Sequence, residues 1–391
     1  MAEWEKVKVG DIGKVITGKT PKTYNSEYYD GNIPFLTPSD DMSVKYVRRT
    51  NKYITELGRL SVKNATLPAN AICVSCIGSD LGKVVITTQE TVTNQQINSI
   101  VVDTDKFDID FVYYSMLELG KVLNFHSKTS TAVPIVNKSS FSQYEIDCPK
   151  LNRQKRIGAI LSSIDKKIEE NNQINNNLEQ QMEALYKSWF IDFEPFNGAK
   201  PENWSKTDIY SIADIIYGAP FSSKLFNTDE VGKPIIRIRD LKNQEFVTYT
   251  TEEHPKGHLI QPGDIIVGMD GEFRPYIWGN ESAWLNQRVC IFENKRPKGK
   301  AFVFFTIKPL LNVIEQTQVA TTVIHIGKKD YDAFEITLPD KTSLDRFDEI
   351  TAPMIDQIVT NRLENKQLAA LRDALLPKLM SGELDVSNID L

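Results

Sequence analysis

The chain contains two copies of one sequence unit, and this repeat limits the folds that are open to it. TAVPIVNKSSFSQYEIDCP (131–149) aligns without a gap on TTVIHIGKKDYDAFEITLP (321–339), and the same offset of 190 residues continues through the segment that follows. Farther upstream the match needs small gaps, but it returns at TNQQI (93–97) and LNQRV (285–289). A repeated unit of this size predicts two similar globular domains, each followed by a long helix.

The globular parts read as short strands broken by Gly, Pro, Asn and Asp, as in VGDIGKVITG and AICVSCIG. A helix-like run, VYYSMLELGKVLNF, interrupts the strands, so we expect an α+β fold of mixed α/β domains. The expected domains are a first globular domain over 1–150, a central long helix over 151–196, a second globular domain over 197–342, and a C-terminal long helix with a tail over 343–391.

Both predicted long helices carry a hydrophobic seam with alternating steps of four and three residues. Asn171 and Asn175 interrupt the first seam, and Asn361 and Asn365 recur at the same positions of the second. If the second helix returns beside the first, the pair is antiparallel and the four amides meet near its middle. Such a layer costs stability and fixes helix register. The alternative is a low-complexity polar tract without a role in the seam.

The length of these helices suggests a molecule that measures a distance. The segment from Arg153 to Phe190 would span ~57 Å as a helix at ~1.5 Å per residue. We therefore expect two similar globular domains separated by a pair of long antiparallel helices, a coiled coil, with a pseudo-two-fold internal repeat. Duplex DNA is a polymer that such a molecule could measure, because its successive major grooves lie ~34–36 Å apart.

The order of these parts resembles the specificity (S) subunit of type I restriction–modification systems over essentially the whole chain. The most specific stretch runs from EIDCPKLNRQKRIGAIL to EALYKSWFIDFEPF, with a strand that ends in proline, an "EQ-x-x-I"-like helix start and a "W-F-x-D-F" exit. This chain departs from the family at the helix start. Asn152 and Arg153 precede Gln154, whereas the family usually has an acidic residue before the glutamine. ALLPKLMSGELDV is similar to the family's C-terminal end, and TGKTPKTYNSEYYDGNIPFLTPSD is similar to the opening of its target recognition domains.

The resemblance implies a non-catalytic DNA-sequence-specificity subunit whose globular domains each read one half of a bipartite, asymmetric DNA target. It also implies that the helices set the spacer between the halves and dock methylation subunits. The partners would be double-stranded DNA, two methylation (M) subunits and, in the full complex, restriction (R) subunits. The sequence has no glycine-rich nucleotide loop, so we expect no enzymatic activity and no cofactor.

Two other functions remain open at this stage. A two-domain coiled-coil scaffold that binds only proteins would lack salt-dependent, sequence-selective binding to duplex DNA. A self-sufficient methyltransferase would need a cofactor pocket, and binding of S-adenosylmethionine would reveal it. The net charge of −6 does not by itself favour DNA.

The composition also limits location and metal chemistry. No apolar run approaches the ~20 residues that span a bilayer, and no signal-peptide core is present, so we expect a cytoplasmic protein. Cys73 and Cys76 lie within a strand-like run and no second pair accompanies them, so buried reduced thiols are expected rather than a metal site.

Candidates for DNA contact are polar or basic residues in expected loops. Amides read adenine edges, and arginine suits guanine or phosphate. Arg288 occupies the position of Gln96 in the other copy, while Asn94 and Gln95 recur as Asn286 and Gln287, which favours a structural role. The alternative for each candidate is an ordinary solvated side chain. The candidates are Lys19, Thr20, Lys22, Gln95, Gln96, Lys128, Thr129 and Ser130 in the first domain, and Arg237, Arg239, Arg274 and Arg288 in the second.

Two of these groups carry a local structural prediction. Arg237 and Arg239 alternate with isoleucines, so they are expected to share one face of a strand. Lys128, Thr129, Ser130 and Thr131 are expected to form a polar loop suited to phosphate.

Overall fold

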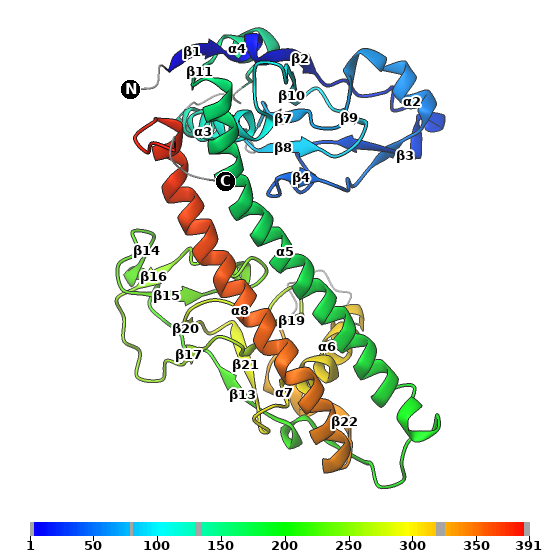
Figure 1. Ribbon diagram of the computed structural model, residues 1–391. Helices are drawn as coiled ribbons and strands as arrows, with labels where there is room; N and C mark the ends of the chain where they lie inside the picture. Colours follow the sequence, from blue (N-terminus) through cyan, green and yellow to red (C-terminus); the bar gives the residue numbers. More distant parts are fainter. Residues whose placement is uncertain (1–3, 79–80, 130–134, 318–324, 387–391) are drawn as a thin grey trace. The chain divides into compact units, whose positions relative to one another are not determined.

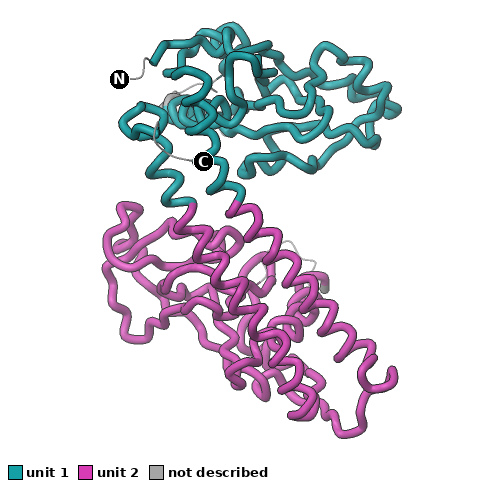
Figure 2. The backbone as a smooth tube through the Cα atoms, viewed as in Figure 1, with its two compact units in different colours: residues 1–166, 369–391 teal, residues 167–368 magenta. Residues whose placement is uncertain are grey.

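The computed structural model describes residues 4–78, 81–129, 135–317 and 325–386 and divides the chain into two compact units (Figure 2). Residues 1–166 and 369–391 form unit 1, and residues 167–368 form unit 2. Both boundaries fall inside the two long helices, so each unit combines one globular part with a segment of both helices. No helix in the described ranges is long and apolar enough to cross a membrane.

Unit 1 is built on two main sheets (Figure 1). One sheet has the order β2-β10-β7-β8-β4, and the other has the order β5-β3-β9-β6. A third, two-stranded sheet pairs β1 with β11. The strands are β1 (Glu5–Lys8), β2 (Gly13–Thr17), β3 (Tyr29–Leu36), β4 (Tyr46–Val47), β5 (Tyr53–Ile54), β6 (Thr66–Leu67), β7 (Ile72–Ser75), β8 (Val84–Thr87), β9 (Thr91–Thr93), β10 (Ile97–Val102) and β11 (Glu145–Cys148).

Four α-helices in the described ranges complete the globular part of unit 1. They are α1 (Val9–Ile12), α2 (Glu56–Ser61), α3 (Ile109–Thr129) and α4 (Lys138–Gln143). The core lies between α3 and the first sheet, where Phe111 and Tyr114 of α3 are fully buried with Ile72 and Ile86 of the strands.

Unit 2 repeats this plan with small changes (Figure 1). Its sheets have the orders β13-β21-β18-β19, β14-β16-β15-β20-β17 and β12-β22. The strands are β12 (Ser205–Asp208), β13 (Ala213–Tyr217), β14 (Phe226–Asn227), β15 (Lys233–Ile236), β16 (Tyr249–Thr250), β17 (Leu259–Ile260), β18 (Ile265–Gly268), β19 (Pro275–Ile277), β20 (Ala283–Leu285), β21 (Val289–Asn294) and β22 (Glu335–Leu338), and the helices are α6 (Lys300–Thr317) and α7 (Lys328–Asp332).

The long helices α5 (Leu151–Phe190) and α8 (Lys341–Met380) pair in opposite directions. Within unit 2, Asn171 bonds Asn365 and Asn175 bonds Asn361, so the residue number falls on α8 as it rises on α5. The predicted antiparallel pair is therefore confirmed, together with the mixed α/β fold and the internal repeat.

The chain leaves α5 at Phe190, before the expected end of the central helix. Phe193 and Asn197 adopt left-handed backbone conformations (φ 55° and 60°) that do not continue a right-handed helix. The exit sequence also builds the core of unit 2, because the ring of Phe190 packs on Phe347 at 4.9 Å and on Phe302 at 5.0 Å between centroids.

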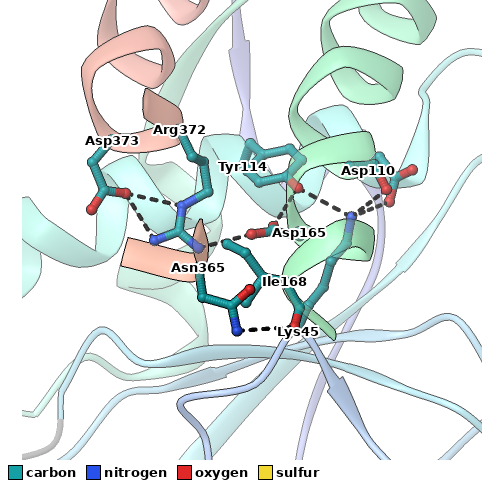
Figure 3. A network of polar contacts seen from close by, with 9 residues as sticks. Lys45, Asp110, Tyr114, Asp165, Ile168, Asn365, Arg372 and Asp373 are labelled. Carbon is teal, nitrogen blue, oxygen red and sulfur yellow. Dashed lines mark hydrogen bonds and ion pairs between the residues drawn. The ribbon is translucent and has the colours of Figure 1, made fainter. Parts of the chain in front are cut away.

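The globular part of unit 1 packs on its segments of the long helices through a polar cluster (Figure 3). The Lys45 ammonium lies 2.8 Å from Asp110 and 2.9 Å from the Ser162 hydroxyl of α5. Tyr114 donates a hydrogen bond to Asp165 of α5, and Arg372 of α8 donates to the same carboxylate at 2.8 Å. Burial, and then the charge of Asp165, raise the pKa of Tyr114, so its hydroxyl stays protonated and donates.

Candidate nucleic-acid interface

In each unit a three-residue connector joins the two main sheets. Residues 94–96 link β9 to β10, and residues 286–288 link β20 to β21. The backbone fixes both connectors in the same way. Asn94 donates to Leu36 at 3.1 Å as Asn286 does to Ile236 at 3.3 Å, and the last connector carbonyl accepts from Cys76 at 2.7 Å or from Met269 at 2.9 Å. Two equivalent frames therefore present different side chains at their last position.

A glycine next to each connector makes this arrangement possible. A Cβ atom on Gly18 or on Gly218 would lie 2.0 Å from the carbonyl oxygen of Asn94 or Asn286, closer than any real contact. The side chain of Asn94 then shapes the first connector, because it accepts from the Gln96 backbone at 3.0 Å and donates to the Gln96 amide oxygen at 2.8 Å. The close approach explains the glycine in both copies, and the side-chain contacts of Asn94 explain the asparagine in the first copy.

Two first-domain candidates, Lys19 and Thr20, lie beside this connector, since the Lys19 backbone donates to the Thr93 carbonyl at 2.8 Å. Thr20 donates to the amide oxygen of Gln95 at 2.7 Å, and Lys19 is exposed. Lys22 is also exposed and lies 5.6 Å from the centroid of the Tyr24 ring, and its hydrogen bond with Tyr24 raises the pKa of Lys22. Lys19 and Lys63 line one depression of about 330 Å³. Lys63 was missed in the sequence, because only the fold brings residue 63 next to residue 19.

The prediction of a polar loop is wrong for its first two residues. Lys128 and Thr129 belong to the last turn of α3, which ends at Thr129. Ser130 and Thr131 lie outside the described residues.

The prediction that Arg237 and Arg239 share one strand face is wrong. Strand β15 ends at Ile236, and Arg239 lies in a 3-10 turn over Ile238–Asp240. The cause is the buried carboxylate of Asp240, which accepts a hydrogen bond from the Arg237 backbone at 3.0 Å and turns the chain. Asp40 makes the same turn in unit 1 by accepting from the Thr37 backbone at 2.7 Å. Arg239 instead donates to Thr248 at 3.1 Å.

The remaining second-domain candidates lie at one end of the β13-β21-β18-β19 sheet. Arg288 immediately precedes β21, and Arg274 immediately precedes β19. Arg274 is exposed and 3.8 Å from Glu272. Arg288 contacts His325 at 3.0 Å and Asp270 at 3.5 Å, and His325 contacts Asp270 at 2.6 Å. No sequence pattern pointed to Asp270 or His325, because these residues come from segments far apart in the chain.

The helix-register residues meet within unit 2. Asn171 donates to Asn365 at 2.9 Å and to Glu364 at 2.7 Å, and Asn361 donates to Asn175 at 2.8 Å. Among the described residues the buried amide oxygen of Asn171 has no hydrogen-bond partner. An unsatisfied acceptor of this kind costs stability.

The described ranges contain no group of His, Cys, Asp or Glu that could hold a metal ion. All four cysteines are buried and free. Burial raises the pKa of Cys73 to about 12 and of Cys76 to about 11, which keeps these thiols protonated rather than ready to bind metal.

Comparison with known proteins places the chain in a family. The model described as "Type I restriction modification DNA specificity domain" matches residues 1–180 and 201–372. The chain is 26% identical to the type I restriction enzyme MjaIX specificity subunit of Methanocaldococcus jannaschii, over 99% of this chain and 95% of that protein. It is 30% identical to the EcoBI specificity subunit of Escherichia coli, over 48% of this chain and 41% of that protein.

The fold agrees with this assignment. The structure is similar to the crystal structure of the type I restriction–modification S subunit from M. genitalium, with a TM-score of 0.59 and 16% identity over 97% of this chain and 96% of that chain. The family match covers most of both copies of the repeat. The chain therefore belongs to the family of type I restriction–modification DNA specificity proteins.

Proposed function

We propose that this chain is the non-catalytic DNA-specificity subunit of a type I restriction–modification complex. Each globular domain reads one half of a bipartite, asymmetric target in double-stranded DNA. One observation carries the proposal beyond the family match: two equivalent connectors present Gln96 in one unit and Arg288 in the other. A shared frame with different polar side chains is what two readers of different bases require, since amides and arginine recognise different base edges.

The positive side chains near the connectors suit contact with the DNA backbone. Lys19, Lys63 and Arg274 are exposed beside or near these segments, and phosphate contacts position a protein on the duplex without reading sequence. In this proposal Lys19, Lys22 and Arg274 position the DNA, whereas Gln96 and Arg288 read bases.

The long helices set the spacer between the two half-sites and dock the partner subunits. Ile174 of α5 and Ile350 and Leu371 of α8 are large apolar side chains that remain exposed. Exposed apolar groups on paired helices suit a protein partner. The two helices come from the two copies of the repeat, which supports two methylation subunits, and restriction subunits join that assembly. Methyl transfer and cleavage belong to these partners.

Exchange of a domain tests the proposal. Residues 197–342 would be replaced by the matching domain of a relative, and methylated bases would be mapped in DNA from cells that carry the complete system. Only one half of the target should change, with the other half and the spacer retained. A reciprocal exchange of residues 1–150 is the control and should change the opposite half. Independent recognition domains would be excluded if either exchange altered both halves or neither.

A further inference from the structure

The last connector residue belongs to a three-residue site that occurs once in each unit. We call this site the reading slot. In unit 1 it consists of Gln96, Ile77 and Ile135, and in unit 2 it consists of Arg288, Asp270 and His325. Isolated antiparallel bridges join Ile77 to Ile135 and Asp270 to His325, which shows that the two slots have the same backbone plan.

Neighbouring backbone bonds support the correspondence. Val136 donates to the carbonyl of Cys76 at 2.9 Å, and Ile326 donates to that of Met269 at 2.9 Å. Cys76 and Met269 are the residues that also bond the connectors. The backbone is therefore the same around both slots, and all three side chains differ.

The unit 2 slot is open to solvent and carries opposite charges. The side chains of Arg288 and His325 are 49% and 48% exposed, and that of Asp270 is 24% exposed. Within the described ranges, the Arg288 contacts to Asp270 and His325 use its Nη1 atom and leave the Nε and Nη2 donors available. The adjacent carboxylate of Asp270 disfavours binding of a phosphate group by Arg288 and holds the guanidinium of Arg288 in place.

These groups match a G·C pair. Guanine offers the O6 and N7 acceptors to an arginine fork, and cytosine offers its N4 donor to a carboxylate. Arg288 would read the guanine and Asp270 would accept from the cytosine. His325, in contact with both, orients the pair.

The unit 1 slot has the chemistry of an A·T pair. Gln96 is partly exposed, and its amide oxygen already accepts one bond from Asn94 at 2.8 Å. A carbonyl oxygen has a second lone pair, so the amide can still accept from adenine N6 while its nitrogen donates to N7. Ile135 is 64% exposed and Ile77 is partly exposed, and apolar side chains suit the thymine methyl group.

We propose that the reading slot recognises one base pair in each half-site, A·T through the first domain and G·C through the second. This inference rests on the proposed function and adds the base chemistry and three specificity residues per domain. It also explains why Asn94 and Gln95 recur in the second copy while Gln96 does not: the first two connector positions shape the frame, and the third reads.

Exchange of the slot residues tests the inference in the complete methylation complex. The variant Arg288→Gln/Asp270→Ile/His325→Ile carries the first slot in the second domain. Methylation would be measured on DNA libraries randomised in one half-site at a time. One G·C position of the second half-site should become A·T, with a change in preference on the order of 10- to 100-fold. The reciprocal variant, Gln96→Arg/Ile77→Asp/Ile135→His, should convert one position of the first half-site.

Two controls separate base reading from loss of structure. In each slot variant the untouched half-site should keep its preference, which shows that the complex has assembled. Arg274→Gln removes an exposed arginine at the same end of the sheet but outside the slot, and should lower methylation without changing any base preference. If the triple variant does not assemble, Arg288→Gln alone should relax discrimination at the same single position.

The outcomes are distinct. A wild-type complex that methylates DNA without sequence preference would overturn the proposed function itself. A sequence-specific wild type whose slot variants assemble and keep the parental half-site would overturn the reading slot alone. A slot variant that changes several positions, or the half-site of the other domain, would also contradict it.

Discussion

Asn361 of α8 donates a hydrogen bond to the amide oxygen of Asn175 of α5 at 2.8 Å. The two residues occupy different positions of the repeat, because Asn361 corresponds to Asn171 and Asn175 corresponds to Asn365. The asparagine pairs are therefore self-complementary: they fix the register of an antiparallel pair, but the same amide pairs could form if two copies of one helix paired. Charged pairs distinguish the two cases. Arg362 of α8 lies 2.8 Å from Glu179 of α5, and their counterparts, Asn172 and Ala369, are uncharged.

Replacement of Asn171, Asn175, Asn361 and Asn365 by leucine should preserve or raise the free energy of unfolding. The change removes a buried amide layer, including the unpaired oxygen of Asn171, and leucine packs well at seam positions. Urea denaturation would measure the stability. Methylation of substrates with different spacers should show broader spacer selection, because no polar layer then penalises a shifted register. A variant that is clearly less stable and equally selective would argue against this role.

Loss of the Arg372 guanidinium should destabilise unit 1. Arg372→Met removes a partner of the nearly buried Asp165 carboxylate, and we expect a cost of about 1–3 kcal/mol in urea denaturation. The counterparts in the other copy are Met182 for Arg372, Ile355 for Asp165 and, in α6, Phe305 for Tyr114, and all three belong to one apolar cluster. The variant Arg372→Met/Asp165→Ile/Tyr114→Phe should therefore recover stability relative to Arg372→Met. A further loss of stability in the triple variant would show that apolar packing cannot replace the polar cluster.

Lengthening both helices together should lengthen the DNA spacer. Four residues inserted after Lys166 in α5 and four after Leu368 in α8 enter at the boundaries of the compact units and keep the asparagine pairs opposite one another. The insertions add ~6 Å of helix, close to two base-pair steps of ~3.4 Å. Mapping of methylated sites should show unchanged half-sites and a longer spacer. The four-residue insertion in α5 alone is the control and should impair assembly. If the double-insertion variant still methylated DNA with the parental spacer at the normal rate, the helices would not set the spacer length.

The two lysines of the first-domain depression should act on DNA affinity rather than on sequence. Lys19→Ala and Lys63→Ala should each weaken binding of the complex to all sequences and reduce the slope of log K against log salt by about 0.9. Lys341→Ala is a matched control, because Lys341 is exposed at the start of α8 and pairs with Asp345. Binding titrations at several salt concentrations would measure these slopes. If the slopes of Lys19→Ala and Lys63→Ala equalled that of Lys341→Ala, the two lysines would not contact DNA.

Protonation of Asp348 should affect the stability of unit 2 in mildly acidic solution. Burial raises the pKa of Asp348 to about 6, against the opposing charge of Arg296 at 2.8 Å. Since the folded pKa lies above the usual value of 3.8, the folded state binds the proton more tightly than the unfolded chain. The free energy of unfolding of the wild type, relative to Asp348→Asn, should therefore fall by on the order of 2–3 kcal/mol as pH rises from about 4 to about 6. The control is Asp356→Asn, at an exposed position of the same helix. A difference in the free energy of unfolding between wild type and Asp348→Asn that stayed constant with pH would contradict the prediction.

Features that depend on spacing along the chain could be predicted from the sequence. The repeat, the two long helices and the asparagine seam follow from periodicity, because residues at steps of four and three share one face of a helix wherever that helix lies. Because the asparagines recur at equivalent positions of both helices, the sequence was enough to predict that these asparagines meet. The equivalence of Gln96 and Arg288 also came from alignment of one copy on the other.

The contacts between separate segments depend on the tertiary fold and could not be predicted from the sequence. Arg239 lies in a turn rather than on a strand because the Asp240 carboxylate bonds the backbone three residues earlier. Asp270 and His325 reach Arg288 across a sheet edge, and Lys63 reaches the depression beside Lys19. No local pattern encodes these contacts, since they depend on strand order and on how each loop closes. The repeat and the helix pairing can be read from residue spacing alone, whereas the residues of each reading slot come together only through packing between distant parts of the chain.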